Sequence, residues 1–198
     1  MEKKTLQVNP YDVGQYAKVI DDLFPAKTMD VFYKICKTLD FIDVGVGSNP
    51  KPQINKNIRN TKGVMFTRYD KKLTHVHWCN YFSTLVAKEI WYQYKPMAPH
   101  INFKKSNRIE ILKYEKGGFY TPHVDHFHDI PRTMSVVIFV NDDFEGGDFE
   151  MFSPDEKQSQ KIKPKKGRTI MFPSNFLYPH KANVVTKGTR YIIVIWNL

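Results

Sequence analysis

Residues 108–125 read RIEILKYEKGGFYTPHVD, two strand-like runs with a pair of glycines between them. Runs of this length and composition, bounded by turn residues, favour β-strands. The second run ends in His-Val-Asp, and side chains two positions apart on a strand point to the same face. The stretch therefore predicts β structure in which His123 and Asp125 lie side by side.

The strand-like pattern continues to the C-terminus. Five further runs follow, separated by turn formers: TMSVVIFV (133–140), DFEMF (148–152), RTIMFP (168–173), HKANVV (180–185) and RYIIVIW (190–196). Many short strands at close spacing are typical of a sandwich or a barrel. We therefore expect residues from about 106 to 198 to form a β core of jelly-roll type.

The N-terminal half has a different periodicity. Apolar residues recur at helical spacing over 29–39 (MDVFYKICKTL) and 78–91 (WCNYFSTLVAKEIW), and Thr28 is a suitable N-cap for the first helix. Together with the strand runs, this pattern predicts a mainly β fold with flanking helices. We expect a single domain over 1–198, in which the residues from about 1 to 105 supply helices that buttress the β core.

The composition excludes several classes of protein. The chain is 41% hydrophobic and 14% aromatic, which is typical of a globular protein and not of a disordered one. No run has the length of uncharged apolar sequence that a membrane helix needs, and the first residues lack the apolar centre of a signal peptide. We therefore expect a cytoplasmic protein, in the host cytoplasm if its source is a virus. Cys36 and Cys79 are expected to be buried thiols.

Two segments account for the net charge of +10. Residues 51–72 carry seven Lys and Arg against one Asp, and residues 155–168 carry six against one Asp and one Glu. Basic loops can attract a nucleic acid or an acidic peptide, and they are also commonly plain solvated surface. Both interpretations stay open at this point.

Residues 43–74 have no steady period and contain several turn formers, which predicts a long loop between the two helices. A loop of this length inside a compact domain is unusual and is often functional. We expect its basic part, 51–72, to form a mobile flap over the substrate side of the site.

A third side chain completes a metal-binding set. His180 opens another strand-like run, so a fold that joins this run to 119–125 brings together two imidazoles and one carboxylate. This is the facial triad of non-haem iron(II) oxygenases, which leaves three coordination positions open, whereas zinc prefers a tetrahedral site richer in His or Cys. Rival histidines are His126, His128, His75 and His77. The last two we interpret as ordinary histidines of a surface or a helix start.

An arginine follows the second histidine of the triad. Arg190 lies ten residues after His180, just beyond a Lys187-Gly188 turn. A two-residue hairpin loop would turn the two side chains to opposite faces, whereas a three-residue loop, 186–188, with glycine last puts them on one face. A guanidinium there is suited to gripping the distal carboxylate of a dicarboxylic acid such as 2-oxoglutarate.

Four segments of the C-terminal half resemble one enzyme family. They are KYEKGGFYTPHVD (113–125), RTMSVVIFVNDDFEGGDFEMF (132–152), KKGRTIMFPSNFLYPH (165–180) and KGTRYIIVIW (187–196). From about 108 to 197 the chain resembles the 2-oxoglutarate/iron(II) dioxygenases of the prolyl 4-hydroxylase type, including their small bacterial and viral members. The segment NIRNTKGVMF (57–66) is similar to the substrate loop of the same family.

The resemblance implies a double-stranded β-helix that holds Fe(II) on His123, Asp125 and His180. It implies 2-oxoglutarate and O₂ as co-substrates, with ascorbate as a candidate reductant. The implied activity is hydroxylation of a C–H bond in a protein or peptide substrate, while 2-oxoglutarate is converted to succinate and CO₂.

The resemblance also implies the residues that bind the co-substrate. Arg190 and Tyr114 match the positions that bind the distal carboxylate of 2-oxoglutarate, and Tyr120 and Trp196 match residues of the pocket wall. Packing of ordinary strand aromatics is the alternative interpretation for Tyr114, Tyr120 and Trp196.

Two departures from the family pattern bear on the substrate. Collagen-type members commonly have lysine at the position of Arg190, and some prolyl hydroxylases have a substrate-holding histidine at the position of Leu198. Two alternatives therefore remain beside a prolyl hydroxylase. One is a nucleic-acid demethylase of the same superfamily, served by the loops 51–72 and 155–168, although that branch usually has a second arginine where this chain has Trp196. The other is a non-catalytic jelly-roll binding module.

Overall fold

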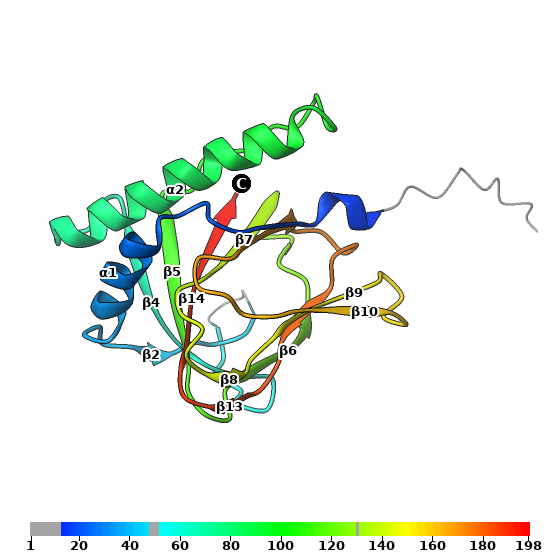
Figure 1. Ribbon diagram of the computed structural model, residues 1–198. Coiled ribbons are helices and arrows are strands. Elements are labelled where there is room, and N and C mark those ends of the chain that lie inside the picture. The colour runs from blue at the N-terminus through cyan, green and yellow to red at the C-terminus, as the bar shows by residue number, and fades with distance from the viewer. Residues whose placement is uncertain (1–12, 48–51, 130) are drawn as a thin grey trace, which may run out of the picture.

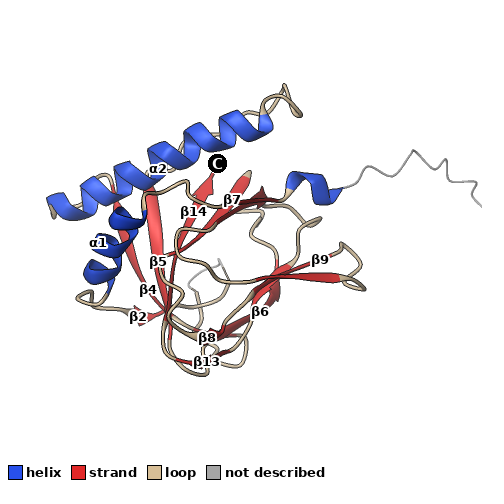
Figure 2. Ribbon diagram, viewed as in Figure 1, coloured by secondary structure: helices blue, strands red, loops and turns tan. Residues whose placement is uncertain are grey.

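The computed structural model describes residues 13–47, 52–129 and 131–198, and it places two α-helices along one side of a stack of β-sheets (Figure 1). The helices are α1 (Ala26–Cys36) and α2 (Leu73–Tyr94), and the short 3-10 helix η1 (Val13–Tyr16) precedes them. No helix in these ranges is long and apolar enough to cross a membrane. Figure 2 shows that strands and loops form the body of the molecule beneath the helices.

The larger sheet lies against the helices and has seven strands. In order across the sheet they are β1 (Lys18–Ile20), β11 (Thr169–Pro173), β7 (Met134–Phe139), β14 (Arg190–Asn197), β5 (Arg108–Tyr114), β4 (Lys62–Thr67) and β2 (Ile42–Asp43). Each neighbouring pair is antiparallel. Because successive side chains alternate between the two faces, each central strand contributes to two separate layers of the interior.

The smaller sheet has five strands and faces the first. They are β10 (Ser159–Ile162), β9 (Phe149–Phe152), β12 (His180–Ala182), β6 (Phe119–His123) and β3 (Arg59–Asn60). A separate pair joins β13 (Val185–Lys187) to β8 (Glu145–Gly146). Two facing antiparallel sheets with helices on one outer side make a jelly roll, so the predicted mainly β fold with flanking helices is confirmed.

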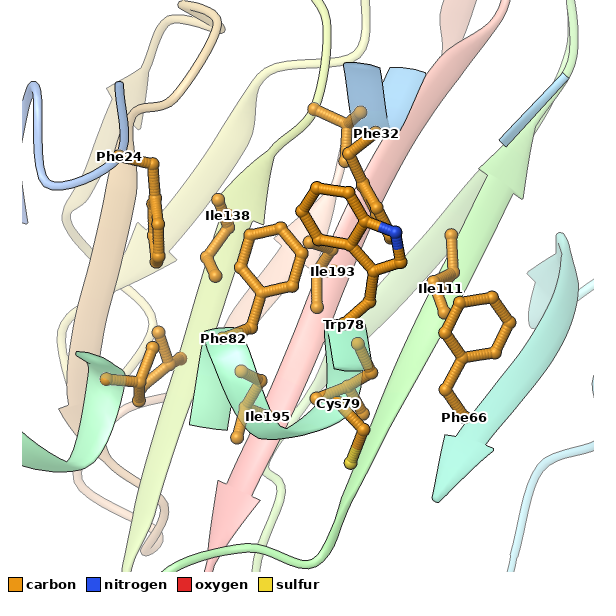
Figure 3. Close-up of a cluster of buried hydrophobic side chains, with 14 of the residues drawn as sticks. Phe24, Phe32, Phe66, Trp78, Cys79, Phe82, Ile111, Ile138, Ile193 and Ile195 are labelled. Carbon is orange, nitrogen blue, oxygen red and sulfur yellow. The ribbon is translucent and has the colours of Figure 1, made fainter. Parts of the chain in front are cut away.

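Two hydrophobic cores share the larger sheet. The first fills the space between this sheet and the helices, where the rings of Phe32 in α1 and Phe82 in α2 lie 4.8 Å apart (Figure 3). The second lies between the sheets and includes Leu112 and Val137 from one sheet and Phe149 from the other. Full burial of one such side chain stabilises a fold by roughly 1.5–3 kcal/mol. The inner core therefore holds the two sheets face to face, and the site lies in this layer.

All seven predicted strand runs contain strands in the structure, and the run 108–114 coincides with β5. The run 180–185 is interrupted, because β12 ends at Ala182 and β13 begins at Val185. The structure adds six strands that were not predicted: β1, β2, β3, β4, β8 and β10. Four of the six belong to the N-terminal half, which therefore supplies strands as well as the helices.

The predicted hairpin around Gly188 is wrong. β13 pairs with β8, whereas β14 pairs with β5 and β7, so the chain changes sheets between Lys187 and Arg190. Gly188 is needed for this crossing because its φ is +78° and a Cβ would lie 3.1 Å from the Cβ of Phe144. The side chains of His180 and Arg190 still share the interior, but they come from facing sheets and not from one hairpin.

The flap predicted over 51–72 is wrong for residues 59–67. Residues 62–67 are β4, a strand inside the larger sheet whose Phe66 is fully buried, and Arg59 and Asn60 pair with β6. The three apolar residues of β4, 64–66, are consecutive and follow a glycine, so the sequence shows neither alternation nor an apolar run long enough to predict a strand. Residues 52–58 and 68–72 are described outside the strands, and 48–51 lie outside the described residues.

Two expectations for the helices have different outcomes. α1 begins earlier than predicted, and Pro25 is its N-cap in place of Thr28, whose backbone N–H donates to the Pro25 carbonyl at 2.9 Å. Proline suits the start of a helix because its fixed φ is already close to the helical value. Cys36 and Cys79 are buried free thiols, as predicted.

Candidate active site

The triad residues come from two neighbouring strands of the smaller sheet. His123 ends β6, Asp125 follows it by two residues, and His180 begins β12 in register with His123. Nε2 of His123 lies 3.8 Å from Oδ1 of Asp125, and Nε2 of His180 lies 3.7 Å from Oδ2. One ligand atom of each residue lies within 4.8 Å of the others. The three groups therefore converge on one point.

Backbone carbonyls fix the orientation of both imidazoles. Nδ1 of His123 donates to the carbonyl of Thr121 at 2.8 Å, and Nδ1 of His180 donates to the carbonyl of Tyr178 at 3.0 Å. With the proton on Nδ1, the Nε2 lone pair of each ring faces Asp125 and is free for a cation. Second partners of this kind are typical of histidines that bind metals.

The charges of the triad also suit a cation. Burial, together with the neighbouring His180, lowers the pKa of His123 to about 3, so its imidazole is neutral at physiological pH. Burial opposes ionisation of Asp125, but the neighbouring histidines outweigh it and the pKa of this carboxyl is lowered. A neutral imidazole beside a carboxylate is the protonation state that metal binding requires.

A buried arginine packs against the cavity wall at Tyr114. Arg190 is 1% exposed, and its guanidinium lies 3.9 Å from the ring centre of Tyr114, its register partner on β5. Nη1 donates to the carbonyl of Gly147, but Nε and Nη2 are buried without a hydrogen-bond partner in the described residues. Burial lowers the pKa of this guanidinium. A buried cation with two unsatisfied donors is a site for an anion with two oxygens.

The other two predicted pocket aromatics also line the cavity. The ring of Tyr120 stacks on that of His123, with centroids 3.6 Å apart and an interplanar angle of 21°. Trp196 lies at the opposite wall under the guanidinium of Arg132, which is 3.8 Å from its ring centre. The cavity has a volume of about 270 Å³ and contains the triad, Tyr114, Tyr120 and Trp196 in its lining.

The rival histidines do not join this site. His126 and His128 are exposed, and Nδ1 of His126 interacts with the carbonyl of Arg132. His75 lies at the start of α2, where its ring stacks on Phe66 and its Nδ1 is 2.8 Å from Asp70. Among the residues that the structure describes, His123, Asp125 and His180 form the one cluster whose geometry suits a metal ion.

Comparison with known proteins supports the family resemblance. Residues 109–197, just under half of the chain, match the family model of the 2OG-Fe(II) oxygenase superfamily. Over this range the chain is similar to members of that superfamily. The matched range contains the whole triad, Arg190 and the three aromatics of the cavity, so the resemblance seen in the sequence is confirmed.

Curated relatives of this chain match over part of their length. Prolyl 3-hydroxylase 2 of Homo sapiens is 44% identical over 66 residues, which are 33% of this chain and 9% of that protein. A PKHD-type hydroxylase of Picosynechococcus is 36% identical over 97 residues, 47% of this chain and 42% of the relative. The chain therefore spans less than half the length of each of these relatives.

Solved structures of prolyl hydroxylases have the same fold. A prolyl hydroxylase from Trichoplax adhaerens, in complex with a peptide fragment of hypoxia inducible factor, gives a TM-score of 0.74 at 18% identity, over 93% of this chain and 84% of that one. A prolyl-4-hydroxylase of Pseudomonas putida gives 0.69 at 18% identity, over 91% of both chains. The viral collagen prolyl hydroxylase of Paramecium Bursaria Chlorella virus-1 gives 0.60 at 21% identity, over 93% and 96%. At these identities the likeness concerns the fold.

The residues of the cavity fit the groups that the superfamily name implies. Two imidazoles and one carboxylate are a suitable donor set for Fe(II), and they leave open coordination positions. The unsatisfied Nε and Nη2 of Arg190 suit one carboxylate of 2-oxoglutarate. The donor set lines the cavity together with Tyr114, and the guanidinium of Arg190 packs on the ring of Tyr114.

Four charged residues of the cavity lining were not predicted as pocket residues from the sequence: Arg59, Arg108, Glu110 and Arg132. Two of them carried a signal. Arg108 and Glu110 have the same strand parity as Tyr114, which the sequence placed in the pocket, so they had to face it as well. Arg59 and Arg132 carried no such signal, because their positions depend on the pairing of β3 with β6 and on the path of the loop after Asp125.

Proposed function

We propose that this chain is an Fe(II)- and 2-oxoglutarate-dependent dioxygenase that hydroxylates a C–H bond in a protein or peptide, with a prolyl residue as the first candidate. The observation that carries the proposal is the joint geometry of the cavity. A His-Asp-His cluster and Tyr114 line the same cavity, and the buried guanidinium of Arg190, with two unsatisfied donors, packs on Tyr114. The metal cluster alone would suit many activities, but an anion site beside it favours a carboxylate co-substrate.

In the proposed site His123, Asp125 and His180 hold the iron, and Arg190 with Tyr114 holds the distal carboxylate of 2-oxoglutarate. When they are bound, iron and 2-oxoglutarate supply the oxidation: one atom of O₂ enters succinate as 2-oxoglutarate loses CO₂, and the other enters a C–H bond of the substrate. The contribution of the protein is to bind and orient these groups and the substrate, and to exclude water from the site.

The described side chains suit these tasks. The ring of His180 lies between Phe149 and Phe172, with centroid distances of 5.1 and 4.8 Å, so apolar rings exclude water from one side of the cluster. Tyr120 covers the ring of His123. Both imidazoles are thereby fixed by rings as well as by their backbone carbonyls, and such preorganisation keeps the metal geometry constant during turnover.

The proposal of a prolyl substrate rests on the relatives, which are named prolyl 3-hydroxylase and prolyl-4-hydroxylase. The departures at Arg190 and Leu198 place the chain apart from the collagen-type enzymes, so the sequence around the proline is open. We further propose a single domain, a cytoplasmic location and ascorbate as the reductant that keeps the iron in its ferrous state.

A nucleic-acid substrate is the weaker proposal, because most of the basic charge is already paired. In the segment 155–168, five of the six cations form ion pairs with Asp side chains: Lys157, Lys163, Lys165, Lys166 and Arg168. In the segment 51–72, Lys56 and Lys62 are paired with Asp43 and Glu115. In the segment 155–168 this leaves Lys161 as the one cation outside an ion pair among the described residues, so that segment offers little to the phosphates of an extended backbone.

The proposed function is tested by optical absorption under anaerobic conditions. Protein with Fe(II) and 2-oxoglutarate should develop a weak visible charge-transfer band, and admission of O₂ should release succinate. The His123→Ala variant should bind iron more weakly and show no band. If the variant and the wild-type protein bind iron equally and neither gives a band, the proposed ligands are wrong.

A further inference from the structure

The cavity has two chemically different ends. At one end Tyr114 of β5 pairs with Arg190 of β14. The other end lies four residues further along the same two strands, where Glu110 pairs with Val194. At about 3.3 Å per residue, the two ends lie about 13 Å apart. Tyr114, which lines the first end, is 2% exposed, whereas Met65, which lines the second end and pairs with Glu110 from β4, is 45% exposed. The end at Glu110 is therefore the mouth through which a substrate reaches the metal.

Glu110 is a half-buried carboxyl group without a partner. It lines the cavity, and in the described residues it makes no hydrogen bond or ion pair. Burial raises the pKa of Glu110, while the charges of Arg59, Arg132 and Arg108 act in the opposite direction. The carboxylate oxygens of Glu110 are not among the buried atoms without a partner, so they are accessible from the cavity and can accept a hydrogen bond from a ligand bound there.

The structure also makes room for this carboxyl group. Gly63 lies beside Glu110 on the neighbouring strand, and a Cβ at that position would lie 3.4 Å from Oε1 of Glu110 and 2.6 Å from Cγ2 of Val44. The side chain therefore reaches across β4 toward the loop that contains Val44 and Gly45, which lines the other side of the mouth. A ligand entering between this loop and β5 meets the Glu110 carboxyl before it meets the metal ligands.

The charge around Glu110 determines which kind of hydrogen-bond donor a ligand can bring to it. Three arginines, Arg59, Arg108 and Arg132, line the mouth with Glu110, so the local charge is positive. A cationic side chain of a substrate would be repelled by them, whereas a neutral N–H can approach the Glu110 carboxylate. The arginines in turn favour carboxylates elsewhere on the same ligand. Neutral N–H groups beside carboxylates are the chemistry of an extended acidic peptide.

We propose that Glu110 is a specificity-determining residue that accepts a hydrogen bond from a backbone N–H of an extended acidic peptide at the mouth of the cavity. This inference rests on the proposed function, because it names the substrate class of the same site. Arg59 and Arg108 flank Glu110 and bind acidic side chains of that peptide. A nucleic acid also offers N–H groups and anions, but the basic segment 155–168, largely paired with Asp, offers it little further surface.

The first part of the test uses two synthetic peptide pools. Each peptide has one central proline, and the flanking positions are enriched in Asp and Glu in one pool and in Lys and Arg in the other. Gain of one oxygen atom is measured by mass spectrometry with the iron-loaded enzyme. We expect the acidic pool to be hydroxylated at least tenfold faster than the basic pool.

The second part locates the hydrogen bond. The best acidic peptide is resynthesised with an ester in place of each flanking amide in turn, which removes one N–H at a time. In the wild-type enzyme one ester position should lower kcat/KM by about tenfold or more, as expected for a hydrogen bond to a charged group. In Glu110→Leu the same ester should cause no additional loss, and Glu110→Gln, which keeps an acceptor oxygen, should restore part of the effect.

Matched controls separate recognition from folding. Glu156→Gln removes the charge of an exposed carboxylate in a turn and should behave as wild type. If Glu110→Leu does not fold, the comparison of Glu110→Gln with wild type in the ester scan carries the test. If Glu110 had only a structural role, its substitution would lower the hydroxylation rates of all the ester-substituted peptides by the same factor.

The outcomes that overturn the inference differ from the failure of the proposed function. Equal use of both pools, no hydroxylation of either pool, the same ester loss in wild type and Glu110→Leu, or competition by a single-stranded oligonucleotide as strong as by the acidic peptide would each overturn it. In all of these cases the enzyme still converts 2-oxoglutarate to succinate. A protein that forms no succinate at all contradicts the proposed function itself.

Discussion

Arg190 is a buried cation that packs against the cavity wall at Tyr114. Its guanidinium packs on Tyr114, donates once to the carbonyl of Gly147 and leaves Nε and Nη2 without partners in the described structure. Leaving a buried charge unpaired is costly, so the folded protein gains most from a ligand that supplies two oxygens here. This arrangement argues for arginine specifically, because a lysine has the charge without the planar fork.

We expect Arg190→Ala to raise the KM for 2-oxoglutarate by about thirtyfold or more, since loss of a buried charge-pair partner costs on the order of 2–5 kcal/mol. Arg190→Lys should have a smaller effect because it retains the charge. Succinate release measured against 2-oxoglutarate concentration provides the comparison. Arg68→Ala, at an exposed arginine, is the control. An unchanged KM in Arg190→Ala would exclude the proposed carboxylate site.

For single residues, the sequence predicted a place in the site wherever a suitable residue type occurred at a suitable spacing. His-x-Asp on a strand fixed one face, and the distance from His180 to Arg190 suggested a shared pocket, although the hairpin invoked for it does not exist. Arg59 and Arg132 could not be predicted, because their position depends on contacts between strands far apart in the sequence. Glu110 could have been found, since strand parity alone places it beside Tyr114 in the cavity.

β4 shows the limit of periodicity for a single element. Its sequence, KGVMFT, contains a glycine and few apolar residues, so it was interpreted as part of a loop. In the structure it forms six register pairs with β5 and buries Phe66 against the helices. Tertiary pairing overrides weak local propensity in such strands. By contrast, β5, β7 and β14 have long apolar patterns and were predicted.

Gly63 in β4 gives a test of this packing. A Cβ there would lie 2.6 Å from Cγ2 of Val44 and 3.1 Å from Cδ2 of Leu112, so we expect Gly63→Ala to lower the free energy of unfolding by about 1–3 kcal/mol. Urea denaturation measures the loss. Adding Val44→Ala removes the nearest atom and should recover part of it. A Gly63→Ala protein as stable as wild type would contradict the close packing of β4 against this loop.

For the molecule as a whole, the basic residues of the segment 155–168 mainly form ion pairs within the protein. Arg168 and Lys165 both pair with Asp21, and Lys166 pairs with Asp30 of α1. These contacts join the loop before β11 to the N-terminal segment on the outside of the larger sheet. The positive net charge of the chain therefore overstates the positive surface available to a partner.

The stability of the metal-free protein should depend on pH through His123. The ordinary pKa of this imidazole is 6.5 and in the folded protein it is lowered to about 3. Between these values the unfolded chain takes up a proton that the folded protein excludes, so stability is complete above 6.5 and is lost as the pH falls. From about pH 7 to about pH 5 we expect a loss of about 1–2 kcal/mol in the free energy of unfolding. Urea titrations at the two pH values measure it, and a loss of equal size in His123→Gln would show that another group is responsible.

The buried position of Arg190 has a kinetic consequence. The guanidinium packs on Tyr114, which lines the buried, blind end of the cavity, and the mouth is about 13 Å away beside Glu110 and Trp196. A molecule bound at the mouth blocks the passage of anything destined for the blind end. In the proposed enzyme 2-oxoglutarate must therefore enter first and succinate must leave last. We expect initial rates that follow a compulsory order, in which 2-oxoglutarate binds before the peptide. Excess peptide should inhibit, because a peptide bound at the mouth before 2-oxoglutarate has entered blocks its access to the buried end.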